Sequence, residues 1–597
     1  MEKSSKRVRA SNTLSFVIKT FATQNLSKVI IECLLASLKN ILILVNAVWL
    51  LNRLADMIFQ QVAFVDMIKL IILMMIVNSL SAFVQYYYQH HIKPQSDLRV
   101  KSQLELLLMQ HSETLPLNCY DNSNFYTSVK QAQNAISEVM FSAYNDFVQM
   151  VGNLAALISA GITVILMNPL LLFFVIFTVP MIFINQKYGS LLSQRNLHLA
   201  FGERKKQYAK EVWLQKDIVK IFKFTNAWKI ADKHYEDGYH NNTRIYSAYG
   251  TRLFIWDSLS SGFSITLIML VCYGYGIFAS KYSDGFSIAE FPVMFVAVMN
   301  MISRIRKIYR AHENLCGYGG QIDELKSFWE MPAEKANENG ISPGRFESLE
   351  FRHVWFSYDK TNWVLKDVSF RIEAGERIAI LGYNGAGKST LIKLILGFYS
   401  VDRGEILYNG ININSYSLQG YRKQFAAAFQ DYKLFSCSLL DNLLMHQSVA
   451  EEEAKVKDIL VQKNRTELSA NIHHILGREY DNSGLVLSGG QQQWLSLARL
   501  YFMPFEIALL DEPSAALDPI TSSEMQREMI QVVGDRTMLL VSHDMSVTKL
   551  VQRILFFENE TLAACGNHET LVRTNARYAD FYMAQAENFS KRKADVL

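Results

Sequence analysis

Gly382-Tyr383-Asn384-Gly385-Ala386-Gly387-Lys388-Ser389-Thr390 is the stretch that decides the fold of this chain. An apolar run, residues 377–381, precedes it and another, residues 391–396, follows it, which predicts a strand, a glycine-rich loop and a helix. Such a loop closes backbone N–H groups around phosphates, while Lys388 reaches the terminal phosphates and the Ser389 hydroxyl binds Mg²⁺. The stretch therefore predicts a nucleotide-phosphate site, and the alternative is a glycine turn before an ordinary helix.

The composition indicates a large protein with a membrane part. The chain has 597 residues, enough for several domains, and 50% of them are hydrophobic while 19% are charged. This balance excludes a disordered chain, and the net charge of +4 argues against a nucleic-acid binder. The six cysteines have no paired spacing, so we expect neither a disulfide framework nor a zinc site. The basic, polar N-terminus shows no cleavable signal peptide.

Six apolar segments approach the roughly 20 residues that a helix needs to cross a bilayer. They cover residues 29–51, 65–88, 147–167, 170–187, 250–278 and 288–308. A shorter mixed segment, residues 14–26, predicts a helix at the membrane interface. Lysine and arginine concentrate in the N-terminal segment, in the connections 89–146 and 188–249, and after the sixth span. Both termini are therefore predicted to be cytoplasmic.

Two of these spans carry polar residues at helical spacing. The polar stripes are Glu32, Lys39 and Asn46 in the first span, and Asn78, Ser81 and Gln85 in the second. Polar groups that face lipid cost several kcal/mol, on the order of 2 to 7, so each stripe should face another helix or a wet interior. Two interpretations stay open, which are hydrogen bonding between helices and a surface that faces the substrate.

The two long connections have a helical pattern with few proline and glycine residues, and they predict extensions of the spans into the cytoplasm. The pattern breaks at residues 117–126 and 221–226, which are candidate docking turns, and the alternative is a plain helix reversal. A polar stretch with proline and glycine, residues 331–345, marks a boundary, and the hydropathy after it is that of a soluble α/β domain.

Two adjacent carboxylates end a strand-like run in this second half. Residues 507–510 are apolar and lead directly to Asp511 and Glu512. A strand end beside a phosphate loop needs one carboxylate for Mg²⁺ and, for hydrolysis, a second to polarise the attacking water. Asp511 fits the first role and Glu512 the second. If this pattern stood alone, a strand that simply meets solvent would be the better interpretation.

A second glycine motif lies upstream of these carboxylates. In Ser488-Gly489-Gly490-Gln491, the serine caps a helix start and the glycines leave N–H groups open to an anion. With this segment the chain resembles the ABC transporter family, because residues 486–493 match the signature motif of that family. Six motifs occur in the order and spacing of the family.

The resemblance implies roles for further residues. Tyr358 stacks on adenine, Gln430 senses Mg²⁺ and couples to the membrane half, residues 514–518 form a loop across the dimer, and His543 contacts the γ-phosphate. The implied nucleotide-binding positions are Tyr358, Tyr383, Asn384, Gly385, Ala386, Gly387, Lys388, Ser389, Thr390, Ser488, Gly489, Gly490 and Gln491. The implied metal-binding positions are Ser389, Gln430 and Asp511, and the implied catalytic positions are Glu512, His543 and Gln430. The cofactors are ATP and Mg²⁺.

The resemblance also implies the architecture of an exporter half-transporter. The expected fold is an all-α polytopic membrane domain of six transmembrane helices, followed by an α/β P-loop ABC nucleotide-binding domain. The expected parts are an N-terminal segment 1–28, a membrane domain 29–330, a linker 331–345 and a nucleotide-binding domain 346–597. In this family ATP lies between the phosphate loop of one subunit and the signature of the other. A second subunit is therefore expected, and a homodimer is the simplest arrangement because all motif positions fit the hydrolytic pattern.

The substrate is the least constrained prediction. The motifs 429–431 and 514–519 resemble those of bacterial exporters of modified peptides such as lantibiotics and related bacteriocins, which implies a multi-pass protein of the bacterial cytoplasmic membrane that contacts lipid and no nucleic acid. Fewer than thirty residues precede the first span, so we expect no peptidase domain there. A lipid flippase, a multidrug exporter, an ATP-gated channel and a non-transport ABC ATPase are the alternatives. The segment 477–484 departs from the usual exporter sequence, and Tyr383 replaces a residue that is often proline or smaller.

Overall fold

The computed structural model describes residues 2–167, 173, 176, 178–282, 291–334, 337, 340–478, 482–513 and 519–584. The chain divides into two compact units. The helical unit comprises Met1–Thr114 and Ser123–Pro332, and the α/β unit comprises Leu115–Asn122 and Ala333–Leu597. A short segment of the first long connection, around α5 (Leu117–Tyr120), thus belongs to the α/β unit.

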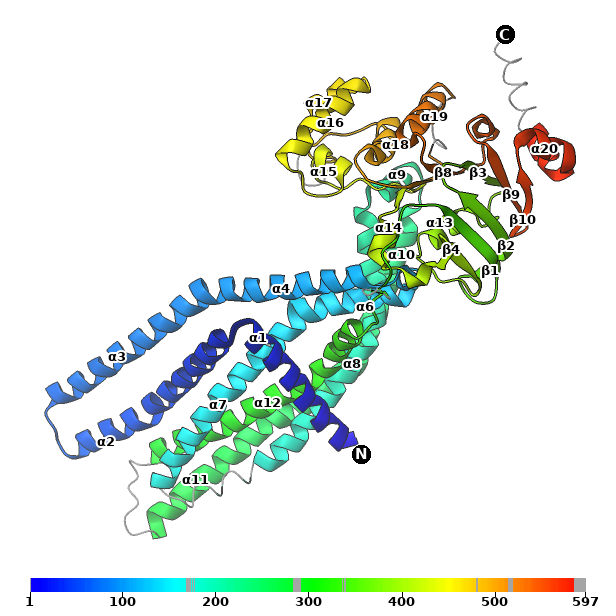
Figure 1. Ribbon diagram of the computed structural model, residues 1–597. Helices are drawn as coiled ribbons and strands as arrows, with labels where there is room; N and C mark the ends of the chain where they lie inside the picture. Colours follow the sequence, from blue (N-terminus) through cyan, green and yellow to red (C-terminus); the bar gives the residue numbers. More distant parts are fainter. Residues whose placement is uncertain are drawn as a thin grey trace. The chain divides into compact units, whose positions relative to one another are not determined.

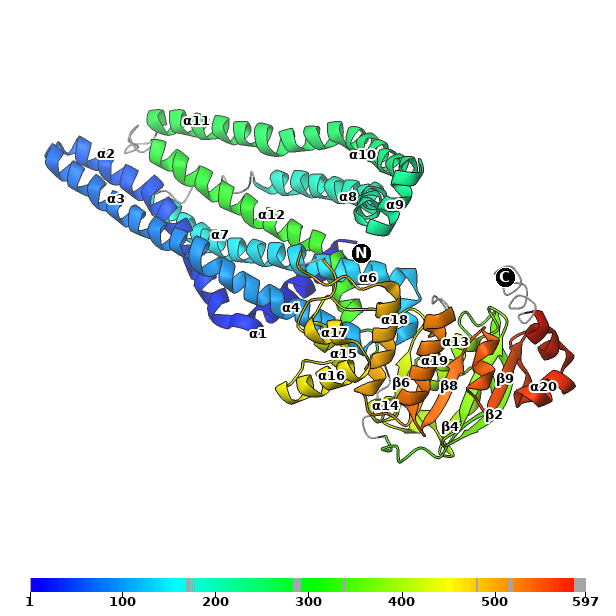
Figure 2. The same ribbon diagram turned by 90° about the horizontal axis from the view of Figure 1, so that it is seen from above.

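Long helices make up the helical unit (Figures 1 and 2). They are α1 (Glu2–Leu44), α2 (Leu51–Phe59), α3 (Phe64–Tyr87), α4 (Lys93–Thr114), α6 (Ser123–Asn134), α7 (Met140–Met167), α8 (Thr178–Leu214), α9 (Lys216–Phe224), α10 (Trp228–Asp257), α11 (Ser264–Tyr282) and α12 (Phe291–Trp329). Short π-helical turns join several of them into longer rods, for example Tyr88–Ile92 between α3 and α4. Helix α7 packs against both α1 and α12, and α8 packs along α10.

The described helices agree in part with the predicted spans. Three helical segments are long and apolar enough to cross a membrane, Asn12–Ile58, Phe64–Thr114 and Asn124–Ile165, and a shorter apolar helix covers Met269–Phe278. They contain the first two predicted spans, nearly all of the third and part of the fifth. Six residues of predicted span 170–187, all of them between 170 and 177, and the first three residues of 288–308 lie outside the described residues. The count of six spans therefore stays a prediction.

Helix α1 is interrupted where the sequence predicts a change from an interfacial segment to a span. Asn25 has an extended backbone (φ −160°, ψ 86°), and its side-chain Oδ1 accepts a hydrogen bond from the Lys28 backbone N–H at 3.0 Å. This side chain thus caps the helix that continues into the first predicted span. The preceding segment does not present its whole apolar face outward, because Val17 and Phe21 are fully buried and Phe21 stacks on Tyr144 of α7.

The polar stripes make hydrogen bonds within the helical unit. The Asn46 side chain donates to Asn78 Oδ1 at 2.5 Å, which joins the first and second stripes. Glu32 is buried and accepts a hydrogen bond from the Tyr88 hydroxyl at 3.1 Å. The Gln85 amide donates to Ser81 Oγ at 3.2 Å within α3. These contacts favour the interhelical interpretation for Asn46, Asn78 and Glu32, whereas Lys39 stays exposed.

The α/β unit contains two sheets. The antiparallel sheet has the strand order β2-β1-β4-β5, with β1 (Ser348–Ser357), β2 (Trp363–Glu373), β4 (Arg403–Tyr408) and β5 (Ile411–Asn412). The larger sheet has the order β10-β9-β3-β8-β7-β6, with β3 (Arg377–Gly382), β6 (Phe425–Ala428), β7 (Ile507–Asp511), β8 (Thr537–Val541), β9 (Arg553–Glu558) and β10 (Thr561–Gly566). Strands β3 and β6 to β9 pair in parallel. Their carboxyl ends therefore meet at one edge, where ligands bind in open α/β sheets.

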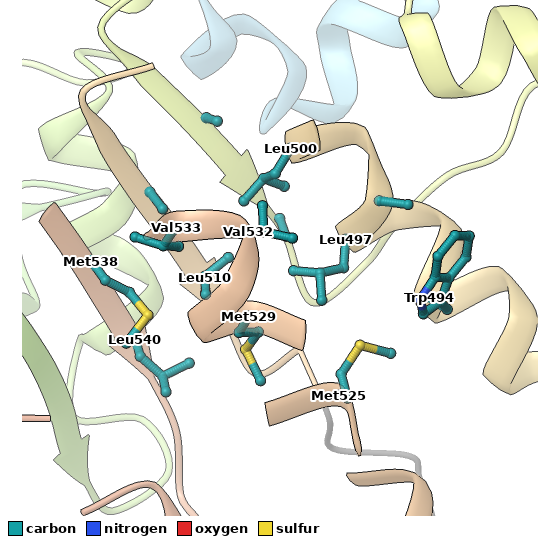
Figure 3. Close-up of a cluster of buried hydrophobic side chains, with 14 of the residues drawn as sticks. Trp494, Leu497, Leu500, Leu510, Met525, Met529, Val532, Val533, Met538 and Leu540 are labelled. Atoms are coloured by element: carbon teal, nitrogen blue, oxygen red, sulfur yellow. The ribbon is translucent and has the colours of Figure 1, made fainter. Parts of the chain in front are cut away.

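Helices cover the larger sheet and close its core. They are α13 (Lys388–Ile395), α14 (Leu418–Arg422), α15 (Leu439–Leu444), α16 (Ala450–Gln462), α17 (Thr466–Ala470), α18 (Gly489–Ala498), α19 (Pro519–Val533) and α20 (His568–Thr574). Figure 3 shows Leu510 of β7 and Leu540 of β8 in one apolar cluster with Leu497 of α18 and Met529 of α19. All four side chains are almost fully buried. This packing fixes β7, and with it the two carboxylates at its end.

The two candidate docking turns differ. At the first, the Tyr399 hydroxyl donates to Asp121 Oδ2 at 2.5 Å, so this turn is held inside the α/β unit. At the second, α9 belongs to the helical unit, and the Phe224 side chain is 92% exposed. A phenylalanine this exposed is available for another surface.

Candidate nucleotide-binding and hydrolysis site

The strand, loop and helix predicted around Lys388 are confirmed. Strand β3 ends at Gly382 and α13 begins at Lys388. Gly387 has a φ of 89°, and a Cβ placed there would lie 2.7 Å from Leu365 Cδ2 and 2.8 Å from the Val364 carbonyl oxygen. Gly385 also has a positive φ, 81°, but a Cβ there would meet open space. The positive φ therefore favours glycine at both positions. At Gly387 the close packing against Leu365 and Val364 also excludes a side chain.

Lys388 is buried inside this loop. Its side-chain Nζ donates to the carbonyl oxygens of Gly382, at 3.0 Å, and of Tyr383, at 2.8 Å. Burial lowers the pKa of the ammonium group, and the negative charges of Glu512 and Asp511 oppose this shift. The cation is thus held by dipoles and charges that are built into the loop and into the end of β7. The neighbouring Ala386 and Asn384 complete the loop, with the Ala386 N–H donating to Tyr383 at 3.3 Å.

Ser389 and Asp511 form an oxygen-rich pair beside the loop. The Ser389 hydroxyl donates to Asp511 Oδ1 at 3.2 Å. Burial raises the pKa of the Asp511 carboxyl, while the hydrogen bond from Ser389 opposes that rise. The described residues contain no cluster of three or more His, Cys, Asp or Glu side chains that could hold a metal ion alone. A hydroxyl and one carboxylate nevertheless suit Mg²⁺, which takes its remaining oxygen ligands from phosphates and water.

Two other predicted site residues converge on Glu512. Its Oε2 accepts a hydrogen bond from the Gln430 side-chain amide at 2.9 Å, and its Oε1 lies 3.1 Å from His543 Nδ1. The backbone of Glu512 has a φ of 47°, in the left-handed region that residues other than glycine rarely adopt. Its N–H is held by the Val541 carbonyl oxygen at 3.0 Å. Strained backbones of this kind concentrate at functional sites, where the surrounding structure maintains them.

The signature segment caps a helix as predicted. The Ser488 hydroxyl accepts a hydrogen bond from the Gln491 N–H at 3.3 Å, and the Gln491 side chain accepts one from the Ser488 N–H at 2.9 Å. This capping box begins α18, and Gly489 and Gly490 are its first two residues. Among the described residues, no hydrogen bond or ion pair joins Ser488 or Gln491 to Lys388 or Glu512. The phosphate loop and the carboxylates at the end of β7 therefore lie together within one chain, whereas the signature segment forms no hydrogen bond with either of them among the described residues.

The two predicted tyrosines occupy different surroundings. The Tyr358 hydroxyl lies 3.1 Å from Thr390 Oγ1, and its ring is 45% exposed. The Tyr383 ring packs edge-on against Phe581 at 5.1 Å. An exposed ring beside the phosphate loop can stack on a planar base. Residues 514–518, and 479–481 within the departing segment 477–484, lie outside the described residues.

Tyr399 and Lys393 are neighbours of the site that sequence reasoning missed. The Tyr399 ring lies edge-on to Tyr358 at 5.2 Å, and its hydroxyl reaches Asp121 of the docking turn. Lys393 Nζ lies 5.5 Å from the Tyr358 ring centroid and 5.9 Å from that of Tyr399. The aromatic pair Phe398-Tyr399 at the end of the phosphate-loop helix is the signal that was available, but only the fold places it beside residue 121.

Comparison with known proteins explains this arrangement. Residues 365–515 match the ABC transporter family model. This segment contains the phosphate loop, Gln430, the signature and both β7 carboxylates. The chain therefore contains an ABC transporter domain.

Two relatives and one solved structure extend the similarity beyond residues 365–515. The chain is 31% identical over 326 residues to the uncharacterized ABC transporter ATP-binding protein YwjA of Bacillus subtilis, a match that spans 54% of this chain and only 55% of YwjA. It is 27% identical over 512 residues to the subtilin transport ATP-binding protein SpaT of Bacillus subtilis, covering 82% of this chain and 81% of SpaT. A solved bacterial Atm1-family ABC exporter with ATP bound has the same fold, with a TM-score of 0.79, 18% identity and coverage of 95% of this chain and 98% of that one.

Proposed function

We propose that this chain is one subunit of a homodimeric, ATP-driven exporter whose substrate is an amphipathic molecule, in the first place a modified peptide. The observation that carries the hydrolytic part is the convergence of Gln430 and His543 on the Glu512 carboxylate, at 2.9 Å and 3.1 Å. A carboxylate that is oriented from both sides can take a proton from a water molecule at a fixed position. The similarity to SpaT, a subtilin transport protein that the match covers to 81%, supports a peptide as the substrate.

Each residue of the site has a separate task in this proposal. Bound ATP would supply the phosphoanhydride whose cleavage drives the cycle, and bound Mg²⁺ would neutralise charge on its phosphates. The loop N–H groups and Lys388 would bind the phosphates, and the oxygens of Ser389 and Asp511, with Gln430, would hold the metal ion. Glu512 would accept the proton of the attacking water, and His543, which lies 3.1 Å from Glu512, would orient that carboxylate and contact the γ-phosphate.

A second copy of the chain completes the site. Ser488 forms no hydrogen bond with the phosphate loop among the described residues, and the N–H groups of Gly489 and Gly490 begin α18 ahead of the capped Gln491. We propose that these groups bind the nucleotide held by the other subunit. Because every described motif position fits hydrolysis, two identical subunits would form two competent sites.

Closure of the two α/β units would be transmitted to the helices by the docking turns near Tyr120 and Phe224. The chain would then lie in a bacterial cytoplasmic membrane with six spans and both termini in the cytoplasm. In this proposal the spans of the two subunits enclose a substrate cavity that opens to the cytoplasm before ATP binds and to the outside afterwards. Hydrolysis by Glu512 would return it to the inward-facing state.

Transport by sealed proteoliposomes tests the proposal. Modified cyclic peptides, linear peptides, cationic dyes and labelled lipids are offered side by side with ATP, and the Glu512→Gln variant serves as the blank. We expect ATP-dependent accumulation of peptides by the wild type alone. Movement of lipid or dye without peptide would replace the substrate assignment by a flippase or a multidrug exporter, and ATP-gated ion conductance without accumulation would identify a channel.

A further inference from the structure

Four basic side chains gather on two helices of the helical unit. Helix α12 carries Arg304, Arg306 and Lys307, and α1 carries Lys39. Lys307 lies about one helical turn from Arg304 on α12, and Arg304 bonds to Asn40, the residue that follows Lys39 on α1. Helices α1, α7 and α12 pack side by side (Figures 1 and 2). We call these four residues the cation cluster. Lys39 lies near the middle of predicted span 29–51, whereas Arg304, Arg306 and Lys307 are among the last five residues of predicted span 288–308.

Arg304 anchors the cluster in the interior. It is only 4% exposed, and its Nη1 donates to Asn40 Oδ1 of α1 at 2.7 Å and to Asn153 Oδ1 of α7 at 3.0 Å. Both asparagines are buried as well. The Nε and Nη2 groups form no hydrogen bond with any described residue. The guanidinium charge is thus oriented by neutral amides, and part of its donor set is unused.

No carboxylate among the described residues pairs with the cluster. Within the described ranges, none of its four residues forms an ion pair with Asp or Glu, whereas other lysines of the helical unit do. Lys28 pairs with Asp97, for example, and Lys130 pairs with Glu211 at 2.5 Å. The cluster therefore keeps its positive charge.

The physical setting makes this charge costly. At the centre of a membrane-spanning helix, where Lys39 is predicted to lie, a lysine costs about 2.5 to 3.5 kcal/mol on insertion scales, so such a residue faces water or a partner of opposite charge. Lys39 and Lys307 are exposed side chains beside the buried Arg304. Since packing alone would favour apolar residues at these positions, the cations need an anion or a wet cavity to be retained.

We propose that the cation cluster binds an anionic group of the transported molecule, a carboxylate or a phosphate on an otherwise apolar compound. Arg304 supplies donors that Asn40 and Asn153 hold in place, and the exposed Lys39 and Lys307 add positive charge. This inference rests on the proposed export function and specifies the charge of its substrate. Zwitterionic or anionic amphipathic molecules would be preferred over cationic ones.

Matched peptides test the charge preference. The chain is reconstituted in phosphatidylcholine nanodiscs, and fluorescence anisotropy follows the binding of two labelled amphipathic peptides that differ only by glutamate in place of glutamine. We expect the acidic peptide to bind about tenfold more tightly than the amide peptide, which corresponds to about 1.4 kcal/mol. In the double variant Lys39→Gln with Lys307→Gln this ratio should fall towards one, while affinity for the amide peptide and basal ATPase activity stay unchanged.

A control variant and a lipid arm complete the experiment. Lys101→Gln removes a half-buried lysine of α4 whose Nζ lies 3.9 Å from Glu105 Oε1, outside the cluster, and it should keep the wild-type ratio. Nanodiscs that contain phosphatidylglycerol test whether the anionic group that binds the cluster belongs to a lipid headgroup instead of a peptide. If anionic lipid stimulates the ATPase only when Lys39 and Lys307 are intact and neither peptide binds, the cluster is an anion site but the peptide proposal is wrong. Equal binding of both peptides without an effect of anionic lipid, or a ratio that the double variant leaves unchanged, would overturn the inference.

Discussion

Lys388 and Arg304 are both buried cations, and their surroundings differ. Lys388 has the carboxylates Asp511 and Glu512 near it, and its ammonium is bonded to two loop carbonyls. Arg304 is bonded only to the amides of Asn40 and Asn153 among the described residues. The nucleotide site thus contains carboxylates that compensate the charge of Lys388, whereas the described residues around Arg304 provide none. We infer that the cation cluster obtains its compensating negative charge from the transported molecule.

Among the substitutions that test the nucleotide site, removal of the proposed base Glu512 should have the largest effect on activity. Glu512→Gln keeps the hydrogen-bonding shape toward Gln430 but cannot accept a proton, so we expect ATP turnover to fall by about 10² to 10⁴-fold. Binding of a fluorescent ATP analogue should persist. Phosphate release and equilibrium binding are measured on the same preparation, and near-normal turnover would refute the role of Glu512.

Asp511→Asn should separate activity from stability. An Asp whose pKa is raised in the folded state holds its proton more tightly there than in the unfolded chain, so ionising it costs folding stability. This cost is absent below the ordinary pKa of about 4, grows as the pH rises through that value, and levels off above the raised pKa. The variant should therefore lose Mg²⁺-dependent ATPase activity but unfold at a higher temperature than the wild type near neutral pH. A lower unfolding temperature across the whole pH range would contradict this reasoning.

Two alanine substitutions compare the glycines of the loop. Gly385→Ala meets open space, so its cost is the positive φ alone, about 1 to 2 kcal/mol. Gly387→Ala has the same cost plus contacts at 2.7 Å and 2.8 Å with Leu365 and Val364, so thermal unfolding and nucleotide binding should suffer more. Equal losses would show that close packing around Gly387 contributes little.

The smallest effect concerns the contact of the docking turn. Tyr399→Phe removes the hydroxyl that donates to Asp121 at 2.5 Å while keeping the ring against Tyr358. We expect basal ATPase activity to stay within about twofold, because no group of the hydrolytic site is lost, while stimulation by a transported substrate falls several-fold. In a double-mutant cycle with Asp121→Asn, the two losses should not add, since both substitutions break one bond. Additive losses would indicate that the contact transmits nothing.

Local motifs made the chemistry of the α/β unit predictable. The loop 382–390, the carboxylates Asp511 and Glu512, and the cap at Ser488 each occupy consecutive residues, and backbone conformation and capping act over such short distances. The pattern of glycines and apolar runs predicted the strand, loop and helix correctly. In the helical unit, hydropathy predicted apolar helices but could not tell which polar residues face a neighbouring helix, because stripes on separate helices have no fixed rotation relative to one another in the sequence.

The sequence by itself determined the order of the motifs, the apolar character of the first half and the residue types that handle a nucleotide. Only the tertiary structure decided that Gln430 and His543 meet at Glu512, that Tyr399 reaches Asp121, and that Arg304 is buried on two asparagines. These pairs are separated by 31 to 278 positions in the chain. Contacts across such separations form because whole strands and helices pack, and that packing depends on the summed apolar burial of each unit rather than on any local pattern.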